Sequence, residues 1–536
     1  MAASPAQDFR KNLTRQVGSL HHEHDLYRWW VLANIMIGTF MAVLDATIVN
    51  VALPKIMATF GVSVDKAEWV ITAYMLVFAV MLPTSGWLAD HFGYKRTYFW
   101  SLFLFTVGSL LCGLSWNESA LIFFRVIQGI GAGLMMPVGM AIVTREFPVE
   151  KRGMAMGFWS IAAATSVSFG PMIGGWLIDN FRWHAIFDVN VPVGILGMLA
   201  TWIIQREYKT EKIVSFDLIG FVSLTVFLVS LLLAMAEGNA AWNTGGWTSR
   251  FILSCFAISL VGLVVFLIDE FTVPDPLIDL SLFKSFNFTI INLILFIFGL
   301  GMFGSTFLLP LYLQGSLGYT ALQAGMVFLP VGILQGVTAP ISGIMADRAN
   351  PKIPIVIGIA ALALSLYLNS FLSLYSEHYQ IMRPLYIRGA AMGLMFAPLS
   401  TVALSAVPRN KIAQASGIIN VIRQIGGSFG IAVLGTLLIR RGIFHAAVYG
   451  QALNQYDPTF KHVAASLAHF VQQSVGGTLA EATTKATALI GSLVGKQALV
   501  QAINDDFLFA SIIIALAVIP ILLIRNNKPG PGKPGS

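Results

Sequence analysis

The sequence GWLADHFGYKR, from Gly86 to Arg96, ends a long apolar segment and enters a short basic loop. A related sequence, GIMADRANPK, begins at Gly343 and also follows an apolar segment. Four residues recur at identical spacing 257 positions later: Gly86, Ala89, Asp90 and Lys95 match Gly343, Ala346, Asp347 and Lys352. A looser pair joins QGIGAGLMMP, from Gln128, to RGAAMGLMFAP, from Arg388. The repeat predicts a chain built from two related halves.

The composition around these loops is that of a membrane protein. The chain has 536 residues, of which 56% are hydrophobic and 11% are charged, and its mean hydropathy is +0.75. A soluble protein carries about 25% charged residues. Apolar runs near the ~20 residues that cross a bilayer recur along the whole chain. The sequence therefore predicts an all-α polytopic membrane protein.

We count fourteen spans, and the Lys and Arg residues predict their direction. The spans lie near residues 29–53, 67–89, 98–115, 119–144, 154–179, 184–204, 216–236, 250–270, 287–313, 320–345, 354–374, 382–407, 413–440 and 505–525. Basic residues crowd the N-terminus and every second loop, whereas loops 237–249 and 313–319 contain none. Because basic loops stay in the cytoplasm, we expect both termini to be cytoplasmic. Both copies of each repeat then face one side, as in secondary transporters with a central substrate site.

Three ionisable residues of the first half share an estimated depth in the membrane. At 1.5 Å per helical residue, Asp45 of VLDATIVNVALP (Val43 to Pro54) lies about 13 Å below the outer surface, and Arg125 and Asp188 lie about 12 and 9 Å below it. A lone charge there costs about 2.5–3.5 kcal/mol. Burial favours a neutral carboxyl, and a nearby Arg opposes that effect. We predict that Asp45 titrates during transport and that Arg125 tunes it. Asp188 is a second proton site, a cation-attracting group or an interfacial residue.

The loop at Gly86 resembles the signature loop of the major facilitator superfamily, of the form Gly-x-Leu-Ala-Asp-x-x-Gly-x-Lys/Arg. The second copy departs from that form at Met345 and Asn350. In the family the loop is a conformational latch, and the resemblance implies this role for Gly86, Asp90, Gly93, Lys95, Arg96 and Asp347. LIFFRVIQGIGAG, from Leu121, is similar to the family's proton-coupling motif and contains Arg125 and Gln128.

A third motif, SFGPMIGG from Ser168, is similar to the signature of the antiporters in this superfamily. Its proline removes a helix hydrogen bond, which predicts a kinked helix with a smooth face. The residues of this kink are Gly170, Pro171, Gly174 and Gly175. Ala162 and Ser166 stand where the longest form of the motif has further glycines. The resemblance favours export.

VLDATIVNVALP resembles the first-span motif of fourteen-span drug:proton antiporters. Matches along residues 29–525, among them NVPVGI at Asn190 and ASGIINVIRQIGGSFG at Ala415, resemble EmrB-type multidrug export subunits. The resemblance implies a major facilitator fold with two six-helix bundles plus two inserted helices, that is, 14 transmembrane helices. Candidates for its cavity or polar network are Asn50, Gln128, Arg388, Asn420, Arg423 and Gln424.

The expected domains follow from this resemblance. They are a cytoplasmic tail 1–28, a first bundle 29–204, two inserted helices with linkers 205–286, a second bundle 287–525 with an outer loop 442–504, and a cytoplasmic tail 526–536. Within the outer loop, residues 467–477 and 482–504 predict short amphipathic helices. In Gram-negative EmrB-type systems an adaptor protein and an outer-membrane channel continue the export path, and this loop would be a natural contact.

Functions other than transport find little support. The spans hold no HExxH motif and no Ser/His/Asp cluster, and the chain has no nucleotide fingerprint, so we expect no enzyme activity and no catalytic residues. HHEHD, His21 to Asp25, lacks the spacing of a metal site. The two cysteines lie in apolar runs. The net charge of +7 sits in loops and does not predict a nucleic-acid partner.

The sequence as a whole favours a proton-coupled antiporter of the inner membrane that exports hydrophobic or amphipathic compounds by alternating access. Such a multidrug efflux protein needs no cofactor, because a proton gradient supplies the energy, and its ligands are small lipophilic substrates. The alternative is a dedicated exporter of a single metabolite, siderophore or fatty acid. A sensor without transport would not need both the coupling Arg and the antiporter kink.

Overall fold

The computed structural model of the chain describes residues 26–209, 215–348, 350–408, 411–453, 456–476 and 478–523. These residues are almost entirely helical, and no strand occurs among them. Most of both predicted tails, including the HHEHD sequence, lies outside the described residues.

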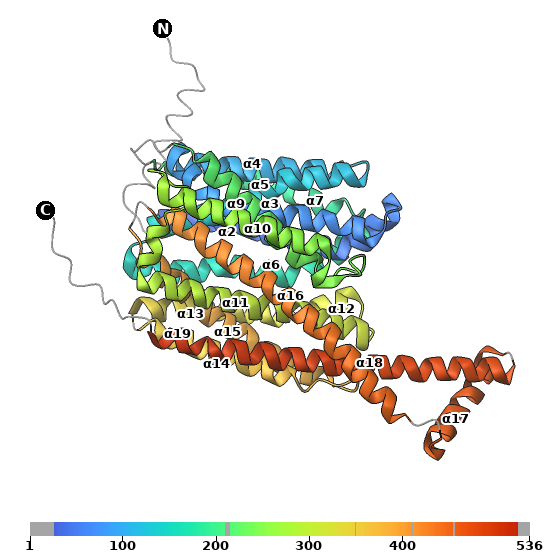
Figure 1. Cartoon of the computed structure of the whole chain (residues 1–536). Coiled ribbons are helices and arrows are strands. Elements are labelled where there is room, and N and C mark those ends of the chain that lie inside the picture. Colours follow the sequence, from blue (N-terminus) through green and yellow to red (C-terminus); the bar gives the residue numbers. More distant parts are fainter. Residues whose placement is uncertain are drawn as a thin grey trace, which may run out of the picture.

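The helices form two bundles joined by a helical hairpin (Figure 1). The first bundle contains α2 (Leu26–Phe60), α3 (Val64–Phe92), α4 (Tyr94–Gly113), α5 (Glu118–Glu146), α6 (Arg152–Asn180), α7 (Ala185–Asp188) and α8 (Asn190–Ile204). The hairpin is α9 (Leu218–Glu237) and α10 (Arg250–Thr272). The second bundle contains α11 (Phe286–Leu311), the π-helical turn η4 (Tyr312–Ser316), α12 (Ala321–Met326), α13 (Leu329–Arg348), α14 (Lys352–Asn369), α15 (His378–Ser405), α16 (Ile412–Ala452), α17 (Pro458–Val475), α18 (Leu479–Leu516) and α19 (Val518–Leu523).

Thirteen of the described helical segments are long and apolar enough to cross a membrane. The remaining predicted span is α4, which packs in the first bundle against α5 and α8 (Figure 1). Its hydropathy is lowered mainly by Lys95 and Arg96 in its first turn and to a lesser degree by hydroxyl residues, of which several face the protein and not the lipid. The buried hydroxyl residues are Thr97, Ser101, Thr106 and Ser109. Their hydroxyls donate to backbone carbonyls, so α4 can cross a bilayer as well. The predicted all-α polytopic fold is confirmed.

The two bundles meet mainly along α6 and α13, and also through α3 and α16. We call the end of the bundles where α2 begins and α19 ends the terminal face (Figure 1). At this face Gly153 and Gly343 bring α6 and α13 into backbone contact. A Cβ added to Gly343 would lie 2.0 Å from the Gly153 carbonyl oxygen. Only glycine permits such an approach.

The C-terminal part of the structure differs from the expected short helices of the outer loop. The helix α16 continues to Ala452, and α18 begins at Leu479 and passes residue 505 without a break. A Thr478–Glu481 capping box starts α18, and the helix contains no proline, so nothing in its sequence stops it before the span. The helix α17 and the adjoining ends of α16 and α18 form an arm that projects beyond the other helices at the end opposite the terminal face (Figure 1). We call it the projecting arm.

The contact between Gly153 and Gly343 generates the first prediction. Gly343→Ala should lower the stability of the protein by about 1–3 kcal/mol, because the added methyl group meets backbone that cannot move aside. Gly442→Ala is the control: nothing lies near its Cβ position in α16, so alanine should stabilise the helix by about 0.5–1 kcal/mol. The measurement is the Tm of both variants in detergent. An unchanged Tm for Gly343→Ala would contradict the packing described.

Candidate transport and coupling site

A closed network surrounds Asp45 of α2, which is fully buried. The Arg125 guanidinium of α5 donates to one carboxylate oxygen and forms a buried ion pair with it. The other oxygen accepts from Gln128 Nε2 at 2.8 Å and from Asn190 Nδ2 at 3.3 Å. Three donors, one of them cationic, therefore face this carboxylate. Charge-assisted bonds of this kind are the strong ones, so these donors stabilise the ionised form of Asp45 in this conformation.

Arg125 makes further contacts on two other sides. Its Nε donates to the Val70 carbonyl at 3.1 Å, and a second bond from Nη1 reaches Gln128 Oε1 at 2.8 Å. The guanidinium lies 4.0 Å from the centre of the Tyr74 ring and 5.8 Å from that of Phe187. An aromatic face attracts a cation and excludes water. The structure therefore satisfies this buried arginine from α3, α5 and α7.

Ser109 completes the network from α4. Its hydroxyl accepts from Gln128 and from Asn190, each at 3.1 Å, and donates to the Phe187 carbonyl at 2.9 Å. Neither Ser109 nor Asn190 was predicted as a site residue. Asn190 stands in the NVPVGI motif, which marked the region but not this role, and no pattern in the sequence singled out Ser109.

Asp188 does not join this network. Its side chain is exposed and lies against Gly113, whereas Asn190, two residues later, faces Asp45. The depth estimate placed Asp188 and Asp45 in one layer, but depth says nothing of direction. A side chain rotates by about 100° around a helix with each residue, so two positions suffice to turn it away. The structure thus brings together Asp45, Arg125 and Gln128 and leaves Asp188 apart.

The two copies of the loop motif make different contacts. In the second copy, the Asp347 carboxylate accepts from the backbone N–H groups of Gly153 at 2.8 Å and Met154 at 2.9 Å. These amides open α6, so the carboxylate of one bundle caps a helix of the other. In the first copy, Asp90 accepts from the Tyr94 hydroxyl at 2.9 Å and lies 4.0 Å from Arg145, all within one bundle. Asp347 of the second copy thus forms a clip between the bundles.

The other residues of the first copy hold the turn between α3 and α4. Gly93 has a φ of +98°, which favours glycine. Lys95 donates its Nζ to the Trp202 carbonyl at 2.7 Å. The Glu207 carboxylate accepts from the backbone N–H groups of Lys95 and Arg96 at 3.0 and 3.3 Å. Burial raises the pKa of Glu207, and these bonds oppose the rise.

Gly86 and the glycines near the antiporter kink pack where helices approach closely. A Cβ on Gly86 would lie 2.9 Å from the Gln414 backbone of α16, across the two bundles. On α6, Gly170 and Gly174 lie against Thr47 and Ile48 of α2. The other two residues of the motif, Pro171 and Gly175, face α12 across the two bundles, near Gly325 and Leu322 respectively. The motif therefore lines contacts with both bundles.

The remaining candidates fall into separate places. Arg423 of α16 donates to Asn420 at 2.9 Å and lies 5.0 Å from the ring of Phe396. Phe396 stacks on Trp159 of α6 at 5.8 Å, which joins the bundles through two aromatic rings. Asn420 lies next to the Met140 sulfur, at 3.9 Å. Of the other candidates, Asn50 is exposed, Gln424 is half-buried and Arg388 is buried. Trp159 was not predicted.

Arg388 differs from Arg125 although both are buried. The guanidinium of Arg388 lies 5.8 Å from the Phe507 ring, the same distance that separates Arg125 from Phe187. However, none of its three nitrogen atoms has a hydrogen-bond partner among the described residues. The second bundle thus holds a buried arginine without the polar shell that the first bundle builds.

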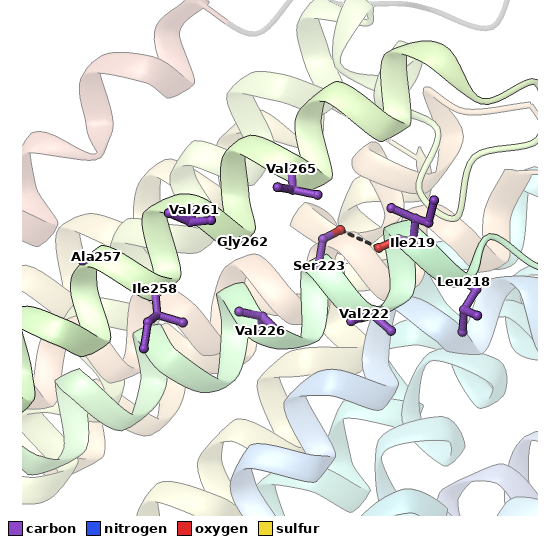
Figure 2. Close-up of a pocket in the computed structure, with 10 residues that line it drawn as sticks. All are labelled: Leu218, Ile219, Val222, Ser223, Val226, Ala257, Ile258, Val261, Gly262 and Val265. Atoms are coloured by element: carbon purple, nitrogen blue, oxygen red, sulfur yellow. Dashed lines mark hydrogen bonds between the residues drawn. The ribbon is translucent and has the colours of Figure 1, made fainter.

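An apolar groove of about 650 Å³ lies between α9 and α10 (Figure 2). It is lined by Leu218, Ile219, Val222, Ser223, Val226, Ala257, Ile258, Val261, Gly262 and Val265. The hydroxyl of Ser223 is directed to the Ile219 carbonyl of its own helix at 2.7 Å. With no charged side chain in its lining, the groove is a surface suited to lipid and is separate from the network. Among the described residues no cluster suited to a metal ion occurs.

The structure thus has two packed helical bundles, a buried charge pair inside the first bundle and a carboxylate clip between the bundles. This is the architecture of a membrane transporter. The chain belongs to the Major Facilitator Superfamily, whose family model matches residues 35–431. It is a multi-pass membrane protein of that superfamily, and the predicted resemblance is confirmed.

Relatives with assigned names extend this result. The multidrug export protein EmrB of Haemophilus influenzae is 35% identical over 79% of the chain and 83% of its own length. EmrB of Escherichia coli K12 is 32% identical over 85% of the chain and 90% of its own length. The fatty acid resistance protein FarB of Neisseria gonorrhoeae is 30% identical over 93% of the chain and 96% of its own length.

Solved structures show the same fold. The human organic anion transporter MFSD10 superposes with a TM-score of 0.58 at 13% identity, covering 91% of this chain and 99% of its own. The proton:xylose symporter XylE also superposes with a TM-score of 0.58 at 13% identity, covering 94% of this chain and 97% of its own. At this identity the likeness concerns the fold alone.

The Asp347 clip generates the second prediction. Asp347→Asn leaves one acceptor for two N–H donors, so the clip should weaken by about 1.5–3 kcal/mol. Hydrogen–deuterium exchange at the amides of Gly153 and Met154 should become faster. Asp90→Asn is the matched control, because Tyr94 and Arg145, the partners of Asp90 described above, belong to the first bundle, and it should leave exchange at those two amides unchanged. Equal exchange in the wild type and in Asp347→Asn would contradict the clip.

A second contact at the terminal face generates a prediction about pH. Asp279, in the linker after α10, is paired with Lys411 at the start of α16. Burial alone would raise the pKa of Asp279, but the bonds from Lys411 and Ser281 outweigh it and hold the pKa below its usual value. The stability that this pair contributes is therefore present above about pH 4 and is lost as the pH falls through the lower folded value.

Asp279→Asn should accordingly lower the free energy of unfolding by about 0.2–1 kcal/mol at neutral pH. The difference from the wild type should shrink only below about pH 4. Thermal melts across the acid range provide the measurement, and Lys411→Gln should reproduce the loss at neutral pH. A difference that vanishes near pH 6 would contradict this account.

Proposed function

We propose that the chain is a proton-driven exporter of hydrophobic or amphipathic compounds. The observation that carries the proposal is the buried Asp45–Arg125 pair, because a carboxylate inside a membrane span marks a proton or ion site by default. The names of its relatives support it, since EmrB, EmrY and MdtP are called multidrug export, resistance or transporter proteins. No cofactor is part of the proposal, and the proton gradient is the energy source.

The proposed location is the inner membrane, with both termini in the cytoplasm. Lys and Arg concentrate at the terminal face, where Lys95, Arg96, Arg145 and Lys411 lie at the helix ends. The opposite short loop after α11, residues 313–319, has none. This asymmetry supports a cytoplasmic terminal face. The projecting arm, at the opposite end, then lies on the outer side of the membrane.

In this orientation the structure represents the state that is closed toward the cytoplasm. The Asp347 clip and the approach of Gly86 to Gln414 hold the two bundles together there. A transporter alternates by breaking one set of such contacts and forming another, and a ligand drives the change only if it favours one state. Inward opening must therefore break the clip.

Protonation of Asp45 is the proposed coupling step. In the ionised form its carboxylate accepts from Arg125, Gln128 and Asn190. A proton on the carboxyl removes the charge attraction to Arg125 and one acceptor position, so the shared network of α2, α5 and α8 must rearrange. Because these helices belong to one bundle, a proton arriving from outside can bias the whole bundle. Return of the proton to the cytoplasm would then drive substrate outward.

The proposed substrate site lies between the bundles. Trp159 and Phe396 present aromatic rings from opposite sides, and Arg423 adds a polar group beside them. An apolar site with a few polar groups suits small lipophilic compounds. The alternative, a dedicated exporter of a fatty acid, draws support from the likeness to FarB over most of the chain.

The projecting arm is the proposed contact for a periplasmic adaptor protein that leads to an outer-membrane channel. It extends beyond the other helices (Figure 1), and several apolar side chains on it are exposed. These include Val463, Phe470, Leu489 and Leu493. Such exposed apolar side chains are typical of a protein–protein contact. Catalysis forms no part of the proposed role.

An accumulation assay tests the function. Cells that lack their own exporters and express this chain should accumulate less ethidium than control cells, and a proton uncoupler should abolish the difference. Asp45→Asn should bring accumulation to the level of the control cells, since the residue can no longer titrate. Asp188→Asn removes the same charge from an exposed site and should retain export. Uncoupler-insensitive export, or full pH-dependent export by Asp45→Asn, would overturn the proton-driven mechanism.

A further inference from the structure

A second buried carboxyl group occurs in the second bundle, on α18. Asp506 is fully buried, and neither of its carboxyl oxygens has a hydrogen-bond partner among the described residues. The fully buried Asp45 has three donors around it. The same functional group is thus placed in two opposite environments within one protein.

The presence or absence of hydrogen-bond donors decides which of the two carboxyl groups can be ionised. Moving an ionised carboxylate out of water without a partner costs far more than moving the neutral acid. Asp45 meets that cost with a cation and two amide donors. Asp506 has no such compensation in this conformation, so its neutral, protonated form is the one compatible with the site.

The charged and titratable neighbours of Asp506 come from several elements. On α18 itself, Asp505 binds Arg441 and His445 of α16, with 2.7 Å between the imidazole Nε2 and the carboxylate. On η4 the Tyr312 hydroxyl donates to the Ser373 carbonyl at 2.7 Å. The other titratable residues of the elements that contact α18 are Arg423, Arg440 and Tyr449 on α16, Lys352 and Tyr367 on α14, and Lys461, His462 and His469 on α17, while α11 and α19 have none. From α15, the buried guanidinium of Arg388 lies 5.8 Å from the ring of Phe507, which follows Asp506, but it forms no hydrogen bond with Asp506.

The Asp505 cluster also offers a way for protons to reach this site. Its side chains are partly exposed at the base of the projecting arm, with 38% of the Arg441 side chain and 22% of that of Asp505 accessible. Histidine is the side chain best suited to hand on protons near neutral pH. Asp506 directly follows Asp505 and lies on the buried side of the same helical turn.

We propose that Asp506 is a second proton-carrying residue of the transport cycle, loaded in the conformation described here and unloaded when α16 and α18 rearrange. This inference rests on the proposed proton-driven function. It assigns opposite protonation states to the two bundles in one conformation: an ionised carboxylate at Asp45 and a neutral acid at Asp506. Unloading requires that Asp506 gain a donor, a cation or water in the alternate state.

Purified full-length protein in liposomes tests the proposal with ethidium as substrate. Two rates are measured: transport driven by a pH gradient, and exchange of ethidium across the membrane without a gradient. Asp506→Asn imitates the neutral acid, so exchange should continue while gradient-driven transport falls several-fold and fewer protons move per ethidium. Asp188→Asn removes an exposed aspartate that lies outside both carboxyl sites and should keep the proton count of the wild type. Asp506→Glu should restore part of the coupling.

The outcomes separate the two proposals. If the wild type shows no gradient-driven transport, the proposed function fails. If the wild type is coupled and Asp506→Asn moves as many protons per ethidium, the inference about Asp506 fails. Should Asp506→Asn not fold, infrared difference spectra of the wild type decide the matter. Addition of ethidium should shrink the protonated-carboxyl band, also in Asp45→Asn, and an unchanged band would overturn the assignment.

Discussion

The structure depends on one electrostatic constraint, which is that a carboxylate buried in a low-dielectric interior must be surrounded by donors. Asp45 meets this constraint only because α2, α4, α5 and α8 converge on a single point, with two polar side chains from α5 and one from each of the others. Removing one partner of a buried ion pair costs about 3–5 kcal/mol. The helices of the first bundle are therefore held in register by the charge, and a change in that charge acts on all of them together.

Movement between the bundles is controlled by a different kind of contact. Where α6 meets α13, glycine allows backbone to touch backbone, and a carboxylate of one bundle caps a helix of the other. Contacts of this type are close in one arrangement and absent in another, with few intermediate positions. The Asp45 network lies inside a bundle, whereas the clip lies between bundles. In the proposed mechanism, the network that senses charge is thus separate from the contact that opens.

Much of the fold could be predicted from the sequence, because the apolar runs and basic loops are physical requirements of a bilayer. The pairing of Asp45 with Arg125 also followed from their similar depth. The direction of a side chain could not be predicted: Asp188 was placed at the depth of Asp45, but it is Asn190 that faces Asp45. Ser109 and Trp159 were not found either, since a serine or tryptophan in a span carries no signal until its neighbours are known. The ends of α16 and α18 were missed because a hydropathy pattern marks where apolar residues stop, whereas a helix continues until a residue breaks it.

The unbroken course of α16 and α18 has a mechanical consequence. The two helices contain 41 and 38 residues, so they are about 62 and 57 Å long, roughly 30 Å more than a bilayer core requires. A rigid-body rotation of the second bundle by ~15°, the size of a known subunit rotation, would swing the far end of such a lever by about 8 Å. A protein bound to the projecting arm would then sense which way the transporter faces. By reciprocity, its binding would change the balance between the two states.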